Sequence, residues 1–183
     1  MADFLRRLLL ILIVLLTTIL SEIAFALATV ATTVWPKTGY ARWLLLGHIA
    51  LTRFRLGLWA RSKRFASELL AFADRYPDDR NCGNAVHRAN ILLGRIALKE
   101  QDVEAAKRFL IAAGRTAGSP QLDSFGPNMS LAKELLELGE TAVVLDYFKL
   151  CSTFWAEDFS RLKHWENDIR FGRKPFFGPN LYY

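Results

Sequence analysis

Three histidines and two cysteines are the residues best suited to catalysis or metal binding, but their spacing forms no recognisable motif. No two histidines lie four positions apart, as two metal ligands on one helix face would. The cysteine spacing matches no zinc or redox motif, and there is no P-loop, nucleophile elbow or dinucleotide-binding glycine motif. We therefore expect a non-catalytic protein with no metal ion, no cofactor and no small-molecule substrate. The residues concerned are His48, His87, His164, Cys82 and Cys151.

The positive charge is concentrated in one short segment. The chain has 183 residues and a net charge of +6. Residues 36–65 contain seven basic residues and no acidic residue, whereas acidic and basic residues nearly balance elsewhere. Because this segment directly follows a hydrophobic one, its expected partner is anionic lipid headgroups and not nucleic acid. The residues expected to contact headgroups are Arg42, Arg53, Arg55, Arg61, Lys63 and Arg64.

The hydrophobic segment, residues 8–35, is long enough to cross a membrane. Its 28 residues would form a helix of about 42 Å, and Trp35 followed by Pro36 is a typical interfacial end. We therefore expect a single-pass anchor over residues 1–36. The basic residues after it favour a cytoplasmic helical domain, and the opposite orientation is the alternative. A carboxylate inside a membrane is costly unless it faces protein, so Glu22 is expected to contact a membrane partner.

The same segment also resembles a secretory signal peptide. Arg6 and Arg7 precede the apolar run, and residues 24–26 or 26–28 fit an A-x-A cleavage motif. Cleavage would release a soluble protein for a periplasmic or secreted partner, in which Cys82 and Cys151 could form a disulfide. The apolar run continues past both motifs, which favours a retained anchor with two cysteines that act as small apolar core residues.

The rest of the chain has the apolar period of α-helices, and part of it resembles the tetratricopeptide repeat. That repeat is a helix–turn–helix unit of about 34 residues with small and large apolar residues at fixed positions. The first clear unit has Leu93-Gly94, Ala97, Ala106, Leu110 and Ala113 at these positions, and the second has Leu131-Ala132, Leu135, Val144, Phe148 and Cys151. A neighbouring phrase, SPQLDSFGPN, is similar to sequence in bacterial repeat proteins and implies no function.

Together with the hydrophobic and basic segments, the resemblance implies an all-α fold with four parts. These are the anchor, a basic helix over residues 37–65, TPR-like helical hairpins over 66–155, and a capping helix with an aromatic tail over 156–183. The basic helix is either interfacial or the first helix of the domain that follows. A short solenoid of this kind presents a concave face to a protein partner.

The tetrapeptide FGPN occurs twice, at residues 125–128 and 177–180. Gly-Pro-Asn favours turns, so we expect two similar turns, each held in place by its aromatic residue. Alternatively, the aromatic tail docks into a groove of this protein or of a neighbour. The residues expected to contribute to such docking are Phe125, Phe176, Phe177, Tyr182 and Tyr183.

These patterns together predict a membrane-anchored helical-repeat adaptor or accessory subunit that mediates protein–protein interaction within a membrane complex. Two alternatives remain open: an exported soluble binding protein, and a lipid-binding module at the membrane surface. The sequence does not identify the partner.

Overall fold

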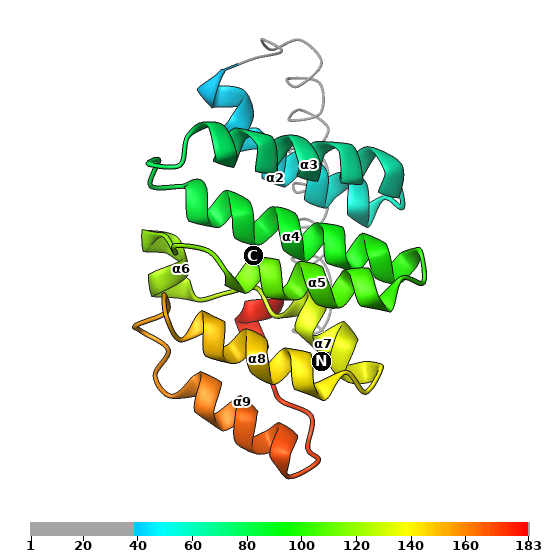
Figure 1. The fold of residues 1–183 in the computed structure, drawn as a ribbon, viewed down its shortest axis with the longest axis vertical. Coiled ribbons are helices and arrows are strands. Elements are labelled where there is room, and N and C mark those ends of the chain that lie inside the picture. The colour runs from blue at the N-terminus through cyan, green and yellow to red at the C-terminus, as the bar shows by residue number, and fades with distance from the viewer. Residues whose placement is uncertain (1–38, 183) are drawn as a thin grey trace, which may run out of the picture. The chain divides into compact units, whose positions relative to one another are not determined.

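The structure, a computed structural model, describes residues 39–182 and shows only helices and connecting turns among them (Figure 1). This confirms the all-α class for the described residues. The elements are α2 (Tyr40–Arg55), α3 (Trp59–Arg75), α4 (Cys82–Lys99), α5 (Val103–Gly114), α6 (Pro120–Phe125), α7 (Ser130–Glu137), α8 (Thr141–Cys151), α9 (Arg161–Arg170) and the 3₁₀ helix η1 (Gly178–Leu181).

The expected anchor lies outside the described residues. This applies to residues 8–35 and to Glu22, so the anchor and its membrane partner stay predictions. Within residues 39–182, no helix combines the length and the apolar character that a membrane span needs.

The chain divides into two compact units, Met1–Leu45 and Leu46–Tyr183. In the described part of the first unit, the rings of Tyr40 and Trp43 pack edge to face, with centroids 5.4 Å apart. All contacts described below lie within the second unit.

Residues 37–65 contain two helices, and not the single helix expected. Helix α2 ends at Arg55, because Gly57 adopts a φ of +72° and the Leu58 amide donates to the Arg53 carbonyl, 2.9 Å away. This is a Schellman C-cap, which glycine permits because it has no Cβ. The chain then re-enters a helix at Trp59, so the expected boundary at residue 65 falls inside α3.

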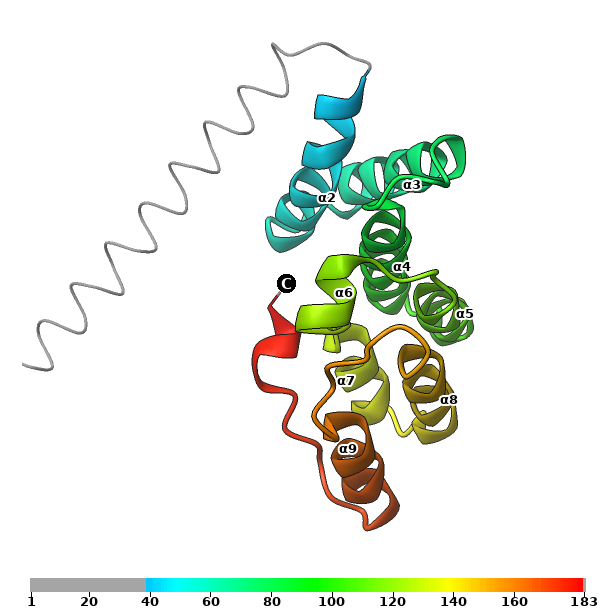
Figure 2. The same cartoon turned by 90° about the vertical axis from the view of Figure 1, so that its left-hand side faces the viewer.

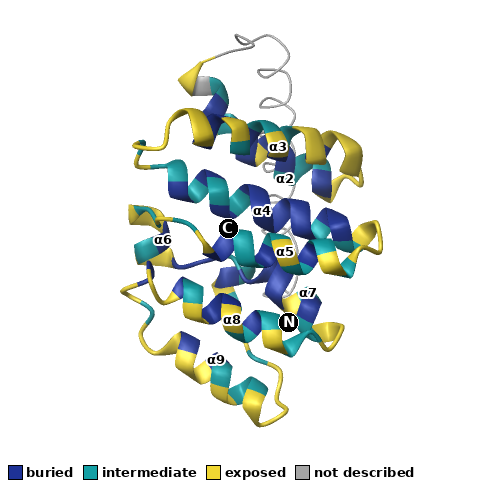
Figure 3. Ribbon diagram, viewed as in Figure 1, coloured by how far each residue is buried: buried dark blue, intermediate teal, exposed yellow. Residues whose placement is uncertain are grey.

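Helix α4 is the centre of the second unit. It packs against α3 and α5, and α5 packs in turn against α8. Figure 2 shows α4 and α7 on one side of the unit, with α3, α5 and α8 on the other, and Figure 3 shows how much of α4 is buried. Small residues make these close crossings possible: a Cβ on Gly114 of α5 would lie 2.8 Å from the Cβ of Leu150 in α8.

Two elements near the tail differ from the sequence expectation. Helix α6 lies in the connection between the two predicted repeat units; the Ser119 hydroxyl accepts from the Leu122 amide at 3.1 Å, and Pro120 stands at its first turn. Helix α9 begins at Arg161, five residues later than predicted, because Phe159 and Ser160 adopt positive φ angles of 48° and 64°.

Candidate ligand-binding groove

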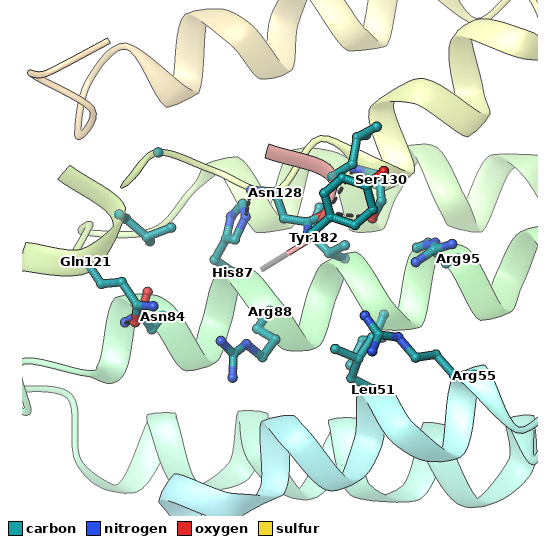
Figure 4. Close-up of a pocket in the computed structure, with 15 residues that line it drawn as sticks. Leu51, Arg55, Asn84, His87, Arg88, Arg95, Gln121, Asn128, Ser130 and Tyr182 are labelled. Atoms are coloured by element: carbon teal, nitrogen blue, oxygen red, sulfur yellow. Dashed lines mark hydrogen bonds between the residues drawn. The ribbon is translucent and has the colours of Figure 1, made fainter. Parts of the chain in front are cut away.

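A groove opens between α2, α4, α6, the α6–α7 loop and the tail of the chain (Figure 4). Its cavity volume is about 70 Å³, and with the open solvent at its mouth the space not filled by atoms is about 670 Å³. Its lining combines basic, amide and aliphatic side chains. The lining residues are Leu51, Arg55, Asn84, His87, Arg88, Ile91, Leu92, Arg95, Gln121, Leu122, Gly126, Asn128, Ser130, Leu181 and Tyr182.

Three arginines line the groove, and they differ in their partners. Arg95 forms an ion pair with Glu134 at 2.6 Å, and its guanidinium lies 4.6 Å from the ring centroid of Phe54. Among the described residues, neither Arg88 nor Arg55 has a hydrogen bond or an ion pair. No acidic residue lines the groove. Two of the three positive charges are therefore uncompensated by residues 39–182.

Arg88 is half-buried against the backbone of α2. A Cβ placed on Gly47 would lie 2.7 Å from the Cδ of Arg88, so the absence of a side chain at Gly47 makes room for it. Burial lowers the pKa of Arg88, because a low-dielectric environment disfavours the charged form. The Arg88 charge also lowers the pKa of His48, as the second cause after burial. Arg88 was not among the residues expected from the sequence, because its position opposite Gly47 follows from the packing of α4 on α2.

His87 holds one wall of the groove in place and has no ring nitrogen left for chemistry. Its Nδ1 lies 3.1 Å from the Ala113 carbonyl, and its Nε2 accepts a hydrogen bond of 2.9 Å from the Asn128 amide. The proton therefore lies on Nδ1, which donates to Ala113. Desolvation lowers the pKa of His87 to about 4, so the ring is neutral near pH 7. His87 thus ties α4 to α5 and to the first FGPN segment.

The two FGPN segments contact each other, and their conformations differ. Gly126 of the first adopts a φ of +83° in a loop, whereas residues 178–181 form a 3₁₀ helix. The Asn180 amide donates to the carbonyls of Phe125 (3.2 Å) and Pro127 (3.0 Å), and the Asn180 carbonyl accepts from the Met129 amide (2.7 Å). The second segment therefore packs against the first and is hydrogen-bonded to it through Asn180. The prediction of two similar turns is wrong.

The aromatic residues of these segments differ in how far they are buried. Phe177 is buried, with its ring centroid 4.9 Å from that of Trp165, and it anchors the tail to the body of the chain. Phe125 was expected to pin its loop, but 60% of it is exposed, because Pro127 and the Asn180 contacts hold that loop instead. Phe176 and Tyr182 are also exposed, and Tyr183 lies outside the described residues.

The residues expected to contact headgroups do not all face solvent. Arg42 and Arg53 are half-buried, and the Nε atom of Arg53 is fully buried. Lys63 forms an ion pair of 2.7 Å with Glu100, and Arg55 lines the groove. Arg55, Arg61 and Arg64 are exposed and have no ion pair among the described residues. Lipid contact by the whole set stays a prediction.

The two thiols are free and are not activated. Burial raises the pKa of Cys151, and burial followed by Asp74, Asp79 and Asp78 raises the pKa of Cys82. In the described part of the chain, no group of three histidine, cysteine or acidic residues could hold a metal ion.

No known protein family, curated protein or solved structure significantly matches this chain.

Proposed function

We propose that this protein is a non-catalytic, membrane-anchored adaptor or accessory subunit that holds part of a partner protein in the groove. The observation that carries the proposal is the groove itself, in which uncompensated cations stand beside aliphatic side chains. Concave sites with a few placed polar groups are where proteins bind ligands.

The chemistry of the lining supports binding and not catalysis. His87 is the one lining residue that could transfer a proton near pH 7, and both of its nitrogens are occupied by main-chain groups. The remaining polar residues of the groove are arginines, amides, a serine and a tyrosine with no base beside them to activate them as nucleophiles.

The order of the helices supports a TPR-like arrangement. Helix α4 pairs with α5 and α7 pairs with α8, at the positions where the sequence predicts two repeat units. The predicted positions Ala97, Ala106, Leu110 and Ala113 are all buried. Helices stacked in this way leave one face open to a partner.

The membrane part of the proposal rests on the sequence. Residues 8–35 have the length and apolar character of a span, and Glu22 within them favours a neighbouring membrane subunit. The cytoplasm is the proposed location of the helical domain, because basic residues follow the span.

The test is extraction of the full-length chain from its native membranes in mild detergent, followed by size-exclusion chromatography and mass spectrometry. We expect a chain that retains Met1 and that travels with a reproducible partner. Leu51→Trp, which fills the groove, should release that partner, whereas Leu138→Trp, on an exposed turn, should not. A soluble chain that begins near residue 29 and travels alone would favour the exported binding protein instead.

A second candidate, contact with the membrane surface, is favoured by the α2–α3 turn. Leu56, Leu58 and Trp59 are 53%, 37% and 40% exposed, close to the exposed Arg61 and Arg64. Apolar side chains beside basic ones are typical of interfacial segments. Flotation of the chain lacking residues 1–38 with phosphatidylserine vesicles, and loss of flotation in Arg61→Glu/Arg64→Glu, would support this function; no flotation would exclude it.

A further inference from the structure

We infer that Arg88 and Arg55 form an oxyanion site, which takes a carboxylate or phosphate group carried by a segment of the partner protein. The inference deepens the proposed function and rests on it for the location of the partner. It concerns the chemistry of the group that enters the groove.

The charges of the groove point to an anion. Of its three arginines, Arg95 is neutralised by Glu134. Arg88 and Arg55 have no such partner among the described residues, and none of the lining residues is acidic. A cation removed from water is unfavourable unless an anion or acceptors compensate it. An incoming oxyanion would compensate Arg88 more strongly than water does.

The geometry holds Arg88 ready for such a contact. Figure 4 shows Arg88 on α4 and Arg55 on α2, both in the space between these two helices. The side chain of Arg88 packs closely over Gly47 of α2, since a Cβ at Gly47 would lie 3.0 Å from Arg88 Nη1. A planar guanidinium offers a fork of N–H donors that matches the two oxygens of a carboxylate or phosphate. Preorganised donors bind more tightly because less side-chain freedom is lost.

The apolar residues of the lining indicate which chemical groups of a bound ligand would lie next to its anionic group. Leu51, Leu122 and Leu181 lie along the walls, and Tyr182 at the rim is 74% exposed. The group that fits is therefore an acidic or phosphorylated side chain with aliphatic or aromatic neighbours. A peptide segment provides this combination.

A lipid bilayer fits this position less well than a peptide. Arg88 is half-buried and lies inside a groove whose walls come from both ends of the described chain, from Leu51 to Tyr182. A flat headgroup layer reaches side chains that project from a surface, as Arg61 and Arg64 do. We therefore assign the recessed site to a protein-borne group.

The experiment uses peptide arrays and the full-length chain in detergent micelles. The peptides have random flanking residues and a central Glu, Gln, phosphoserine or Ser. We expect the chain to prefer Glu over Gln or phosphoserine over Ser, and the stronger of the two preferences identifies the source of the oxyanion. Arg88→Met keeps most of the aliphatic stem and removes the charge, and it should weaken binding about 10- to 100-fold. Arg108→Met, on the exposed side of α5, is the matched control and should bind as the wild type does.

Loss of binding through misfolding is separated by thermal unfolding. Because Arg88→Met removes a desolvated cation, we expect its melting temperature to equal or exceed that of the wild type. No preference for the charged peptides, or a preference that Arg88→Met retains, would overturn the inference. Binding to anionic vesicles alone, lost in Arg88→Met, would also overturn it. These outcomes do not depend on whether a partner protein co-purifies with the chain in detergent. The hypothesis of an adaptor function and the hypothesis of an oxyanion site can therefore be refuted separately.

Discussion

The side chain of Asn180 donates a 3.0 Å hydrogen bond to the carbonyl of Pro127, and both residues are buried. This contact joins the end of the described chain to a loop that precedes it by more than fifty residues. It also fixes the backbone that carries Asn128, which lines the groove. The first prediction concerns this link.

Asn180→Ala should destabilise the protein. The substitution leaves the buried carbonyl of Pro127 without its side-chain donor and the carbonyl of Phe125 with one donor fewer, and a buried polar group without a partner costs about 1–3 kcal/mol. Urea unfolding of the wild type and the variant measures the difference. Asn167→Ala, on the exposed side of α9, should change the free energy of unfolding by less than about 0.5 kcal/mol. Equal stabilities of the two variants would contradict the role given to Asn180.

The stability of the protein should fall as the pH decreases from about 6.5 to about 4. The pKa of His87 is about 4 in the folded state and near 6.5 when unfolded, so in this window the unfolded chain binds a proton that the folded chain does not. The stability that His87 contributes is therefore present above pH 6.5 and decreases by up to about 3 kcal/mol towards pH 4. Unfolding in urea at a series of pH values measures this slope.

The control for this pH dependence is a pair of histidine variants. His87→Gln should be less stable at pH 7.5 and should flatten the slope between pH 6.5 and 4. His164→Gln, exposed on α9, should leave the slope unchanged. A wild-type slope that persists in His87→Gln would assign it to other groups, of which His48, with its lowered pKa, is the first to test.

Glu134→Gln should increase the affinity of the groove for acidic peptides. The ion pair with Glu134 neutralises Arg95, and its removal adds a third uncompensated cation to the lining. Since the two charged side chains are mostly buried, we expect a gain of several-fold, measured by peptide fluorescence anisotropy at low and high salt. Glu137→Gln removes an exposed carboxylate of the same helix and should have no such effect. Weaker binding by Glu134→Gln would show that Glu134 acts by orienting Arg95.

Glu22→Leu distinguishes an anchor that stands alone from one that contacts a membrane subunit. A carboxylate that faces a protein partner contributes to assembly, so its replacement should shift the chain out of the complex in detergent. The shift is measured by size-exclusion chromatography of the extracted chain. If the chain stays in the complex, Glu22 has no partner within the membrane, and the groove carries the interaction.

The sequence predicted the elements with strong apolar periods and failed where a single residue decides the backbone. The helical apolar period of the chain beyond the hydrophobic segment correctly indicated helices such as α3, in which Ala66, Leu69 and Ala73 are buried. Gly57 and Ser160 change the direction of the backbone because both adopt positive φ angles, which the spacing of apolar residues does not predict.

The groove was harder to predict, because its residues are brought together by packing. Arg55 was chosen for its position in a basic segment, whereas Arg88 lies in a helix whose composition is unremarkable. Its importance depends on the Gly47 backbone opposite and on the lack of a carboxylate nearby, and both are consequences of how α2 meets α4. The repeated FGPN tetrapeptide is visible in the sequence. The hydrogen bonds by which Asn180 of the second copy joins the first are seen only in the structure.

The link between Asn180 and the first FGPN segment also sets the order of events during synthesis. The walls of the groove that come from α2 and α4 leave the ribosome early, whereas Leu181 and Tyr182 emerge more than eighty residues after α4 is complete. The groove therefore cannot capture a partner with its full lining before Tyr182 has left the ribosome. Nascent or prematurely terminated chains would present an unfinished surface, so entry into a complex would be reserved for molecules translated at least as far as Tyr182.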